Sequence, residues 1–282
     1  MDIDSAFNSI KDNIKDGNND LALSQVKEIV ESNIDSPEIL IKCASLLKVI
    51  EAEDDVQSIL DTVMSNLPSD EDELLKVAVN LRGLGRVDDT YSIYRSLKTK
   101  SPDLYDLAQT LYLLDEYESA MAELLKADTL GRKERILLTE CYSAVGEYSK
   151  AETEAQALLD EFGPAYDILV NMSKVLFEKG DAKGAVKFAK SYLKEDKKNL
   201  DNLALNAYVM RINGKTMAAV NYSTRVLNAD YTHVGALETL AYCHIERKSY
   251  VSAKLLAGAI NDADPGNPAA VRILDACRLM SS

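Results

Sequence analysis

The stretch EKGDAKGAV at residues 178–186 is followed, 34 residues later, by INGKTMAAV at residues 212–220. In both copies a glycine, Gly180 or Gly214, stands five residues before an alanine. Glycine accepts the left-handed backbone angles at which many helices end. The shared pattern therefore predicts a turn between two helices, and its recurrence predicts that the turn is repeated along the chain.

The second copy also contains Gly214-Lys215-Thr216, which matches the end of a phosphate-binding loop. Such a loop requires an earlier glycine at position 209 and a strand before that glycine. Position 209 is a valine, and the apolar residues upstream have helical spacing. We therefore interpret these three residues as the corner of a helical hairpin.

Small side chains recur at a similar period through most of the 282 residues. In the first helix of successive units they are Ala44, Ala78, Ala108, Thr139, Ser173, Ala207 and Ala241, at steps of 34, 30, 31, 34, 34 and 34. In the second helix they are Ala22, Val56, Thr90, Ala120, Ala151, Ala185, Ala219 and Ala253. Four positions before each first-helix member stands a large residue: Leu40, Leu74, Leu104, Arg135, Leu169, Leu203 and Leu237. Two antiparallel helices approach closely only where the facing side chains are small, so each unit is predicted to be a helical hairpin.

One helical hairpin cannot cover its own apolar face, so such units have to stack. Glycines punctuate five of the predicted turns, at Gly17, Gly85, Gly146, Gly180 and Gly214. All six prolines lie at predicted unit boundaries, where a helix has to stop: Pro37, Pro68, Pro102, Pro164, Pro265 and Pro268.

In its length of 34 residues, its large–small–large order and its prolines at repeat ends, the pattern resembles the tetratricopeptide repeat (TPR) family. The resemblance implies an all-α fold, a right-handed α-solenoid of about eight helical hairpins with a C-terminal capping helix. The chain departs from the family where the first-helix Trp, and in most units the Tyr, is replaced by Leu. We expect one solenoid over residues 1–282, with repeats near 3–36, 37–70, 71–100, 101–131, 132–165, 166–199, 200–233 and 234–267 and the capping helix at 268–282.

The same resemblance suggests where a partner would bind. A helix turns by about 100° per residue, so positions 4, 8 and 11 of each repeat share one side of its first helix. Positions 2, 5, 6, 9, 12 and 13 lie around the opposite side, which in the TPR family lines a concave groove that receives peptides. The candidate partner-binding residues at these positions are Lys42, Lys48, Lys76, Arg82, Tyr105, Tyr112, Asn171, Lys174, Tyr208, Arg211 and Tyr242.

Within this set we expect two groupings. The four cations of the second and third repeats would form a cluster, and Tyr208 would neighbour Tyr242 with Lys174, Asn171 and Arg211 close by. The alternative is that the lysines are only solvated and that the tyrosines pack as side walls. Some TPR proteins hold the carboxyl terminus of a chaperone through a clamp of Lys, Asn and Arg, of which Asn171 and Lys174 provide only fragments.

Composition restricts the class of function. The formal net charge of −14 disfavours nucleic acids and acidic membranes as partners. No apolar run reaches the roughly 18 residues of a membrane span, and the amino terminus carries acid where a secretory signal would carry Lys or Arg. We therefore expect a cytoplasmic protein without membrane insertion. The four cysteines contain no C-x-x-C pair and are expected to be buried, apolar-like residues rather than metal ligands.

These observations favour a non-catalytic scaffold that binds an extended or helical segment of another protein, with acidic groups of that segment opposite the lysines. With two histidines, neither beside a plausible nucleophile, and no phosphate cradle, we expect no enzymatic activity and no cofactor or metal. Two alternatives remain: an RNA-binding helical-repeat protein, which the net charge disfavours, and a self-associating structural subunit of a larger complex.

Overall fold

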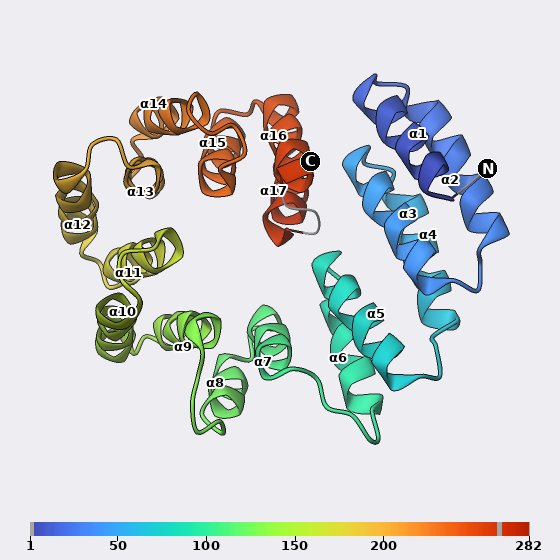
Figure 1. Ribbon diagram of the computed structural model, residues 1–282, viewed down its shortest axis with the longest axis horizontal. Helices are drawn as coiled ribbons and strands as arrows, with labels where there is room; N and C mark the ends of the chain where they lie inside the picture. Colours follow the sequence, from blue (N-terminus) through green and yellow to red (C-terminus); the bar gives the residue numbers. More distant parts are fainter. Residues whose placement is uncertain (1–2, 264–266, 282) are drawn as a thin grey trace. The chain divides into compact units, whose positions relative to one another are not determined.

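The computed structural model describes residues 3–263 and 267–281, and over these ranges the chain forms seventeen α-helices and no strand (Figure 1). Contacts along the chain divide it into two compact units, which we call unit 1 (Met1–Ser101) and unit 2 (Pro102–Ser282). The predicted all-α repeat fold is confirmed. The continuation of both units as one solenoid over residues 1–282 stays a prediction.

The described part of unit 1 consists of three helical hairpins. Its helices are α1 (Ile3–Lys15), α2 (Asn19–Ser32), α3 (Pro37–Val49), α4 (Glu53–Ser65), α5 (Glu71–Gly83) and α6 (Val87–Ser96). Each consecutive pair, α1 with α2, α3 with α4 and α5 with α6, packs together and occupies one predicted repeat range.

Unit 2 contains five further hairpins and a last helix. Its helices are α7 (Leu104–Leu113), α8 (Tyr117–Leu124), α9 (Arg132–Ala144), α10 (Tyr148–Phe162), α11 (Tyr166–Glu178), α12 (Ala182–Glu195), α13 (Leu200–Ile212), α14 (Thr216–Leu227), α15 (Val234–Glu246), α16 (Tyr250–Ala263) and α17 (Pro268–Ser281). We call the first helix of each repeat its A-helix and the second its B-helix. The last helix, α17, packs on both α15 and α16, which is the place predicted for a capping helix.

The prolines fit the helix boundaries. Pro37 and Pro268 are the first residues of α3 and α17, and Pro68, Pro102 and Pro164 lie in connections between helices. A proline is tolerated at the first helical position because its missing N–H has no intrahelical partner there. The sixth, Pro265, lies outside the described residues.

The turn inside every hairpin holds one residue with positive φ. In five hairpins this residue is the predicted glycine, at φ between 70° and 93°. In the other three it is Glu51, Asp115 or Lys248, at φ of 60° to 62°. The same turn therefore forms without glycine, although a side chain in this conformation costs about 1–2 kcal/mol.

The predicted small positions form the contact between the two helices of each hairpin. All fifteen, from Ala22 to Ala253, have an exposed fraction of 0%. The hydroxyls of Thr90 and Thr139 donate to backbone carbonyls, whereas the buried Ser173 hydroxyl has no hydrogen-bond partner within the described residues. The Thr90 hydroxyl, for example, donates to the carbonyl of Ala78 on the facing helix at 3.0 Å. The small-residue pattern thus marks the core of the stack.

Arg135 occupies a position that is leucine in the other repeats. Its guanidinium donates to the carboxylates of Glu154 and Glu161 on α10, at 2.5 Å each. The two acids stand seven residues apart, which places them on one side of α10. The arginine stem can therefore fill the apolar site while its charged end is neutralised by the neighbouring helix.

All four cysteines are buried, as the sequence predicted, and no disulfide joins them. Burial raises the pKa of the Cys43 and Cys141 thiols to about 12, so these groups are protonated at neutral pH. None of the helices within the described ranges combines the length and hydropathy that a membrane span requires.

Candidate partner-binding face

The predicted cations of unit 1 do not share one environment. Lys42 is half exposed, with its Nζ 3.9 Å from a carboxylate oxygen of Asp4 and 4.7 Å from the ring centre of Phe7. Lys76 lies on the exposed side of α5. Two of the four predicted cations therefore face solvent.

Lys48 lies inside unit 1, with only 7% of its surface exposed. Its ammonium donates to the backbone carbonyl of Leu84 at 3.0 Å, at the carboxyl end of α5. A helix end leaves such carbonyls without an intrahelical partner, and a cation is favourable there. Arg82 is half buried. The structure thus uses Lys48 within the fold, and the predicted cluster of four open cations is reduced accordingly.

In unit 2 the A-helices lie in succession: α7 contacts α9, and the contacts continue through α11, α13 and α15 to α17. Position 9 of the repeat is Glu140 on α9, Lys174 on α11, Tyr208 on α13 and Tyr242 on α15. We call the surface made by positions 9, 12 and 13 of α7, α9, α11, α13 and α15 the A-face. It includes five predicted residues: Tyr112, Lys174, Tyr208, Arg211 and Tyr242.

Lys174 links two successive repeats on the A-face. Its ammonium is 2.9 Å from a carboxylate oxygen of Glu140, which stands 34 residues earlier on α9. Burial alone would lower the pKa of the Lys174 ammonium, but Glu140, Tyr112 and Glu178 outweigh it and raise the pKa. Burial raises the pKa of the Glu178 carboxyl, while Lys174 opposes that shift. This lysine is therefore charged and locally neutralised.

Arg211 is held by two tyrosines and an acid. Its guanidinium carbon lies 5.8 Å from the ring centre of Tyr208 and 4.9 Å from that of Tyr242. One guanidinium nitrogen is 3.4 Å from Glu246, and the other carboxylate oxygen of Glu246 accepts a hydrogen bond from Thr216 at 2.9 Å. Cations over tyrosine faces are stabilised by the ring quadrupole. The structure thus brings together Tyr208, Arg211 and Tyr242 from two repeats.

The two tyrosines of α7 have separate partners. Lys133 lies over the ring of Tyr105 at 4.6 Å, and Gln109 donates to the Tyr105 hydroxyl at 3.2 Å. The ring of Tyr112 meets that of Tyr117 edge-on at 5.2 Å. Burial raises the pKa of the Tyr112 hydroxyl, and the same cause raises the pKa values of Tyr208 and Tyr242. All three hydroxyls are therefore neutral donors at physiological pH.

Asn171 lies inside the stack rather than on the A-face. It is 3% exposed, and neither its amide nitrogen nor its amide oxygen has a hydrogen-bond partner within the described residues. The equivalent positions of the other regular repeats of unit 2, Leu137, Leu205 and Thr239, are also buried. Position 6 in these repeats therefore belongs to the core, which removes Asn171 from the open face.

No family model matches the chain, and no curated protein matches it. Among solved structures, a tetratricopeptide repeat protein from Parabacteroides merdae is 14% identical, with 86% of this chain and 98% of that chain covered at a TM-score of 0.52. A thermophilic TPR protein of Thermus thermophilus is 15% identical, with 73% and 98% covered at a TM-score of 0.40.

The chain has the tetratricopeptide repeat fold. The structure bears this out independently through its consecutive hairpins and its buried small positions. The identity to the Parabacteroides merdae protein is low, so the shared fold is what that comparison establishes.

The A-helices of unit 2 also carry acids, absent from the predicted set, that pair with cations of a neighbouring helix of the stack. Opposite charges stand one repeat apart on the A-helices: Glu140 with Lys174, Arg211 with Glu246, and Glu238 with Arg272 at 3.1 Å. The signal was available, because each pair is separated by 34 or 35 residues. This regular separation is seen only when the positions of acids as well as cations are aligned between repeats.

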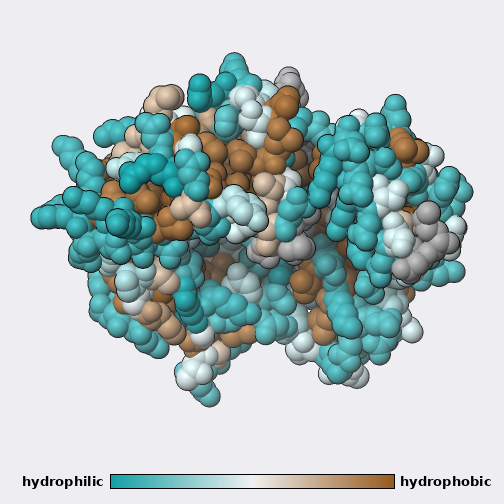
Figure 2. Space-filling view, turned by 45° about the horizontal axis from the view of Figure 1, so that its top comes forward, coloured by the Kyte–Doolittle hydropathy of each residue, from teal (hydrophilic) through white to brown (hydrophobic). Residues whose placement is uncertain are grey.

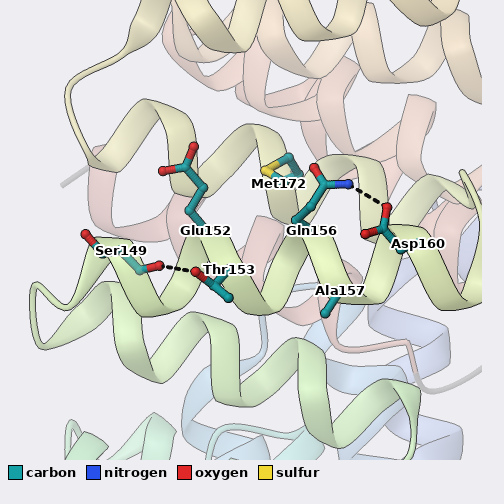
Figure 3. Close-up of a pocket in the computed structure, with 7 residues that line it drawn as sticks. All are labelled: Ser149, Glu152, Thr153, Gln156, Ala157, Asp160 and Met172. Carbon is teal, nitrogen blue, oxygen red and sulfur yellow. Dashed lines mark hydrogen bonds between the residues drawn. The ribbon is translucent and has the colours of Figure 1, made fainter.

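The B-helices α4 and α10 border open pockets. One of about 600 Å³ runs along α10, where Figure 3 shows a row of polar side chains beside Met172 of α11. Its lining residues are Ser149, Glu152, Thr153, Gln156, Ala157, Asp160 and Met172. A similar pocket follows α4. Within the described residues, no three His, Cys, Asp or Glu side chains are grouped as metal ligands would be.

Proposed function

We propose that this TPR-fold chain is a non-catalytic scaffold that holds a segment of another protein, extended or helical, on the A-face of unit 2. The observation that carries the proposal is the arrangement of Arg211 between Tyr208 and Tyr242. Solenoids of stacked helical pairs present extended surfaces of this kind for binding.

The side chains of this face suit protein binding. Tyr and Arg dominate the binding energy of many interfaces, because they bury a large contact area with few rotatable bonds or offer several donors. Tyr208 and Tyr242 are half buried, so their positions are fixed before a partner arrives. A surface that is already ordered loses less conformational entropy on binding.

The charges of the A-face are largely paired among themselves. Lys174 is neutralised by Glu140, and Arg211 by Glu246. A partner therefore meets aromatic rings with neutralised charges around them. We expect its contacts to be mainly apolar and hydrogen-bonded, with a weak dependence of the dissociation constant on salt.

Unit 1 offers a second, ionic contribution to the same function. Of the predicted cations, Lys42 and Lys76 are exposed, and we propose that Lys76 contacts acidic groups of a partner. Changing Lys76 to Glu should weaken the binding of such a partner, whereas the same change at the exposed Lys11 of α1 should not. Equal affinity of both variants for the partner would remove Lys76 from the binding surface.

The A-face is tested by site-specific crosslinking. A photoreactive phenylalanine analogue replaces Tyr208 or Tyr242, with Tyr231 as the control, because its side chain is 80% exposed on the connection between α14 and α15. After irradiation in a cell extract, we expect one shared protein adduct from the two A-face positions and no such adduct from position 231. The same adduct from all three positions would refute binding at the A-face.

Titration with the purified partner then measures how much each side chain contributes to the Kd. Tyr208→Ala, Arg211→Ala and Tyr242→Ala should each weaken binding by about 2 kcal/mol, close to thirtyfold in Kd, because they remove central aromatic or arginine anchors. Tyr231→Ala should leave Kd unchanged. If none of the three variants changes the Kd, the proposed face is wrong.

A further inference from the structure

Helix α12 carries a row of lysines on the side opposite its buried face. Ala185 and Ala189 are fully buried, whereas lysines at positions 183, 187, 190 and 194 are all exposed. We call these four the α12 row: Lys183, Lys187, Lys190 and Lys194. Their spacing of four, three and four residues places them in one line of about 16 Å along the helix. The left edge of Figure 2, where α12 lies, is covered by hydrophilic side chains.

The ammonium groups of the α12 row are not paired. Among the described residues, none of the four makes an ion pair, a hydrogen bond or a ring contact, although the neighbouring Lys174 and Lys179 pair with Glu140 and Glu152. Lys197 and Lys198 follow directly and are also exposed. Residues 182–198 thus hold six lysines and two acids in a chain of net charge −14.

The acids next to the row are directed elsewhere. Asp181 accepts a hydrogen bond from the backbone N–H of Gly184 and caps the start of α12. Asp196 accepts from the backbone N–H groups of Lys198 and Asn199. Glu195 is exposed at the end of the helix and makes no ion pair with the row among the described residues. The row therefore keeps a strong local positive charge.

The fold does not require these lysines. The same four positions hold Asp54, Ser58, Asp61 and Ser65 on α4, and Ser149, Thr153, Gln156 and Asp160 on α10. On those helices the positions line the open pockets described above. Like charges four residues apart destabilise a helix, so the α12 row weakens α12 unless an anionic group lies against it.

We propose that the α12 row binds an acidic helical segment of a partner protein. The row is straight, and its spacing is that of one helix face, so glutamates at the same spacing on a second helix can face all four ammonium groups. The net charge of −14 repels extended polyanions such as duplex DNA or an acidic membrane beyond the row. A short acidic helix experiences mainly the local field, because charges are screened within about 10 Å at moderate salt. This binding surface is separate from the A-face.

The test uses a labelled helical peptide of about 16 residues with four glutamates at the spacing of the row, and a matched peptide with glutamines. Binding is followed by fluorescence anisotropy at low and at physiological ionic strength. The variant is Lys187→Gln, Lys190→Gln and Lys194→Gln combined. Its control is Lys11→Gln, Lys15→Gln and Lys98→Gln combined, which removes the same charge from exposed lysines of unit 1.

We expect the glutamate peptide to bind the unmodified chain in a salt-dependent manner, and the α12 variant to bind it about tenfold more weakly. The control variant and the glutamine peptide distinguish binding at the row from a general effect of net charge. An equal loss of affinity in the control variant, or equal affinity for the glutamine peptide, overturns the proposal. Circular dichroism of both variants verifies that the helices are intact.

Three further outcomes also overturn it. Anionic vesicles that bind more tightly than the peptide, with loss in the α12 variant, would assign the row to a membrane surface. Duplex DNA that binds more tightly than the peptide, with loss of binding in the α12 variant, would assign the row to nucleic acid. A dimer in sedimentation that the α12 variant dissociates would assign it to a second copy of this chain. The A-face variants are unaffected by any of these results, so the two proposals fail separately.

Discussion

Exchanging Lys248 for glycine is expected to stabilise unit 2. Lys248 lies in the turn between α15 and α16 at φ 60°, where five other hairpins have glycine. Removing a side chain from this conformation gains about 1–2 kcal/mol. The added freedom of glycine in the unfolded chain costs about 0.4–1 kcal/mol. The net gain is therefore roughly 0.5–1 kcal/mol, which raises Tm by about 1–4 °C for a unit of this size.

Two matched variants isolate the contribution of the left-handed backbone conformation to the free energy of unfolding. Lys248→Ala removes the long side chain but keeps a Cβ in the left-handed conformation, so its stability should change by less than about 0.5 kcal/mol. Gly180→Ala is the reciprocal change at φ 93°, where an added Cβ meets nothing within 4 Å. Its expected loss of roughly 0.5–1 kcal/mol is therefore the backbone strain minus the entropy that alanine removes from the unfolded chain, with no contribution from a steric clash.

Urea unfolding followed by circular dichroism measures all three variants, with the slope m compared to verify that the same surface unfolds. A lower midpoint for Lys248→Gly, or an equal effect of glycine and alanine at position 248, would refute the explanation. Either result would mean that the turn does not hold this residue in the left-handed conformation at an energetic cost.

Three more predictions follow from features of the core and of one connection. The Glu71 carboxylate accepts hydrogen bonds from the Thr99 hydroxyl and the backbone N–H groups of residues 98–100, which lowers its pKa to about 2. Because the pKa of Glu71 in the folded chain lies below the ordinary 4.5, its contribution to folding stability is complete above pH 4.5 and is lost as the pH falls towards about 2. The variant Glu71→Gln should speed amide hydrogen exchange at residues 98–100 at neutral pH. Unchanged exchange would contradict this prediction. Ala207→Leu should destabilise unit 2 by about 1–3 kcal/mol in urea unfolding because its site is fully buried, whereas Ala122→Leu on the exposed side of α8 should not. The thiols of Cys43 and Cys141 should react with a colorimetric disulfide reagent only after unfolding, since both are 0% exposed; rapid reaction of the native chain would show that the core opens.

The repeat pattern predicted the helices well, because it depends on a local steric requirement. Two helices crossing at a small residue need that residue in every repeat, and Ala44, Thr139 and Ser173 are all fully buried as expected. The glycine pattern predicted five of the turns but not the three that hold Glu51, Asp115 or Lys248. A side chain can adopt the same backbone angles where the surrounding helices hold it, so composition alone cannot locate those turns.

The candidate site was harder to predict, because it depends on neighbours from other repeats. Lys42 and Lys48 were assigned to one face of α3, yet Lys48 turns inward to the carbonyl of Leu84. Asn171 was assigned by position, although the leucines at the same position in two other repeats already indicated burial. The four lysines of the α12 row are visible in the sequence, but they lie on a second helix, whereas the predicted groove consists of first-helix positions.

The charge pairs one repeat apart have a consequence for how the chain could be rearranged. Blocks of 34 residues have similar backbones, and by shape alone they could be exchanged or deleted. Removing residues 166–199 would bring Glu140 opposite Tyr208 and leave its carboxylate without the lysine it now faces. Where such a pair joins two hairpins, their order along the chain is therefore favoured by charge as well as fixed by the peptide bonds.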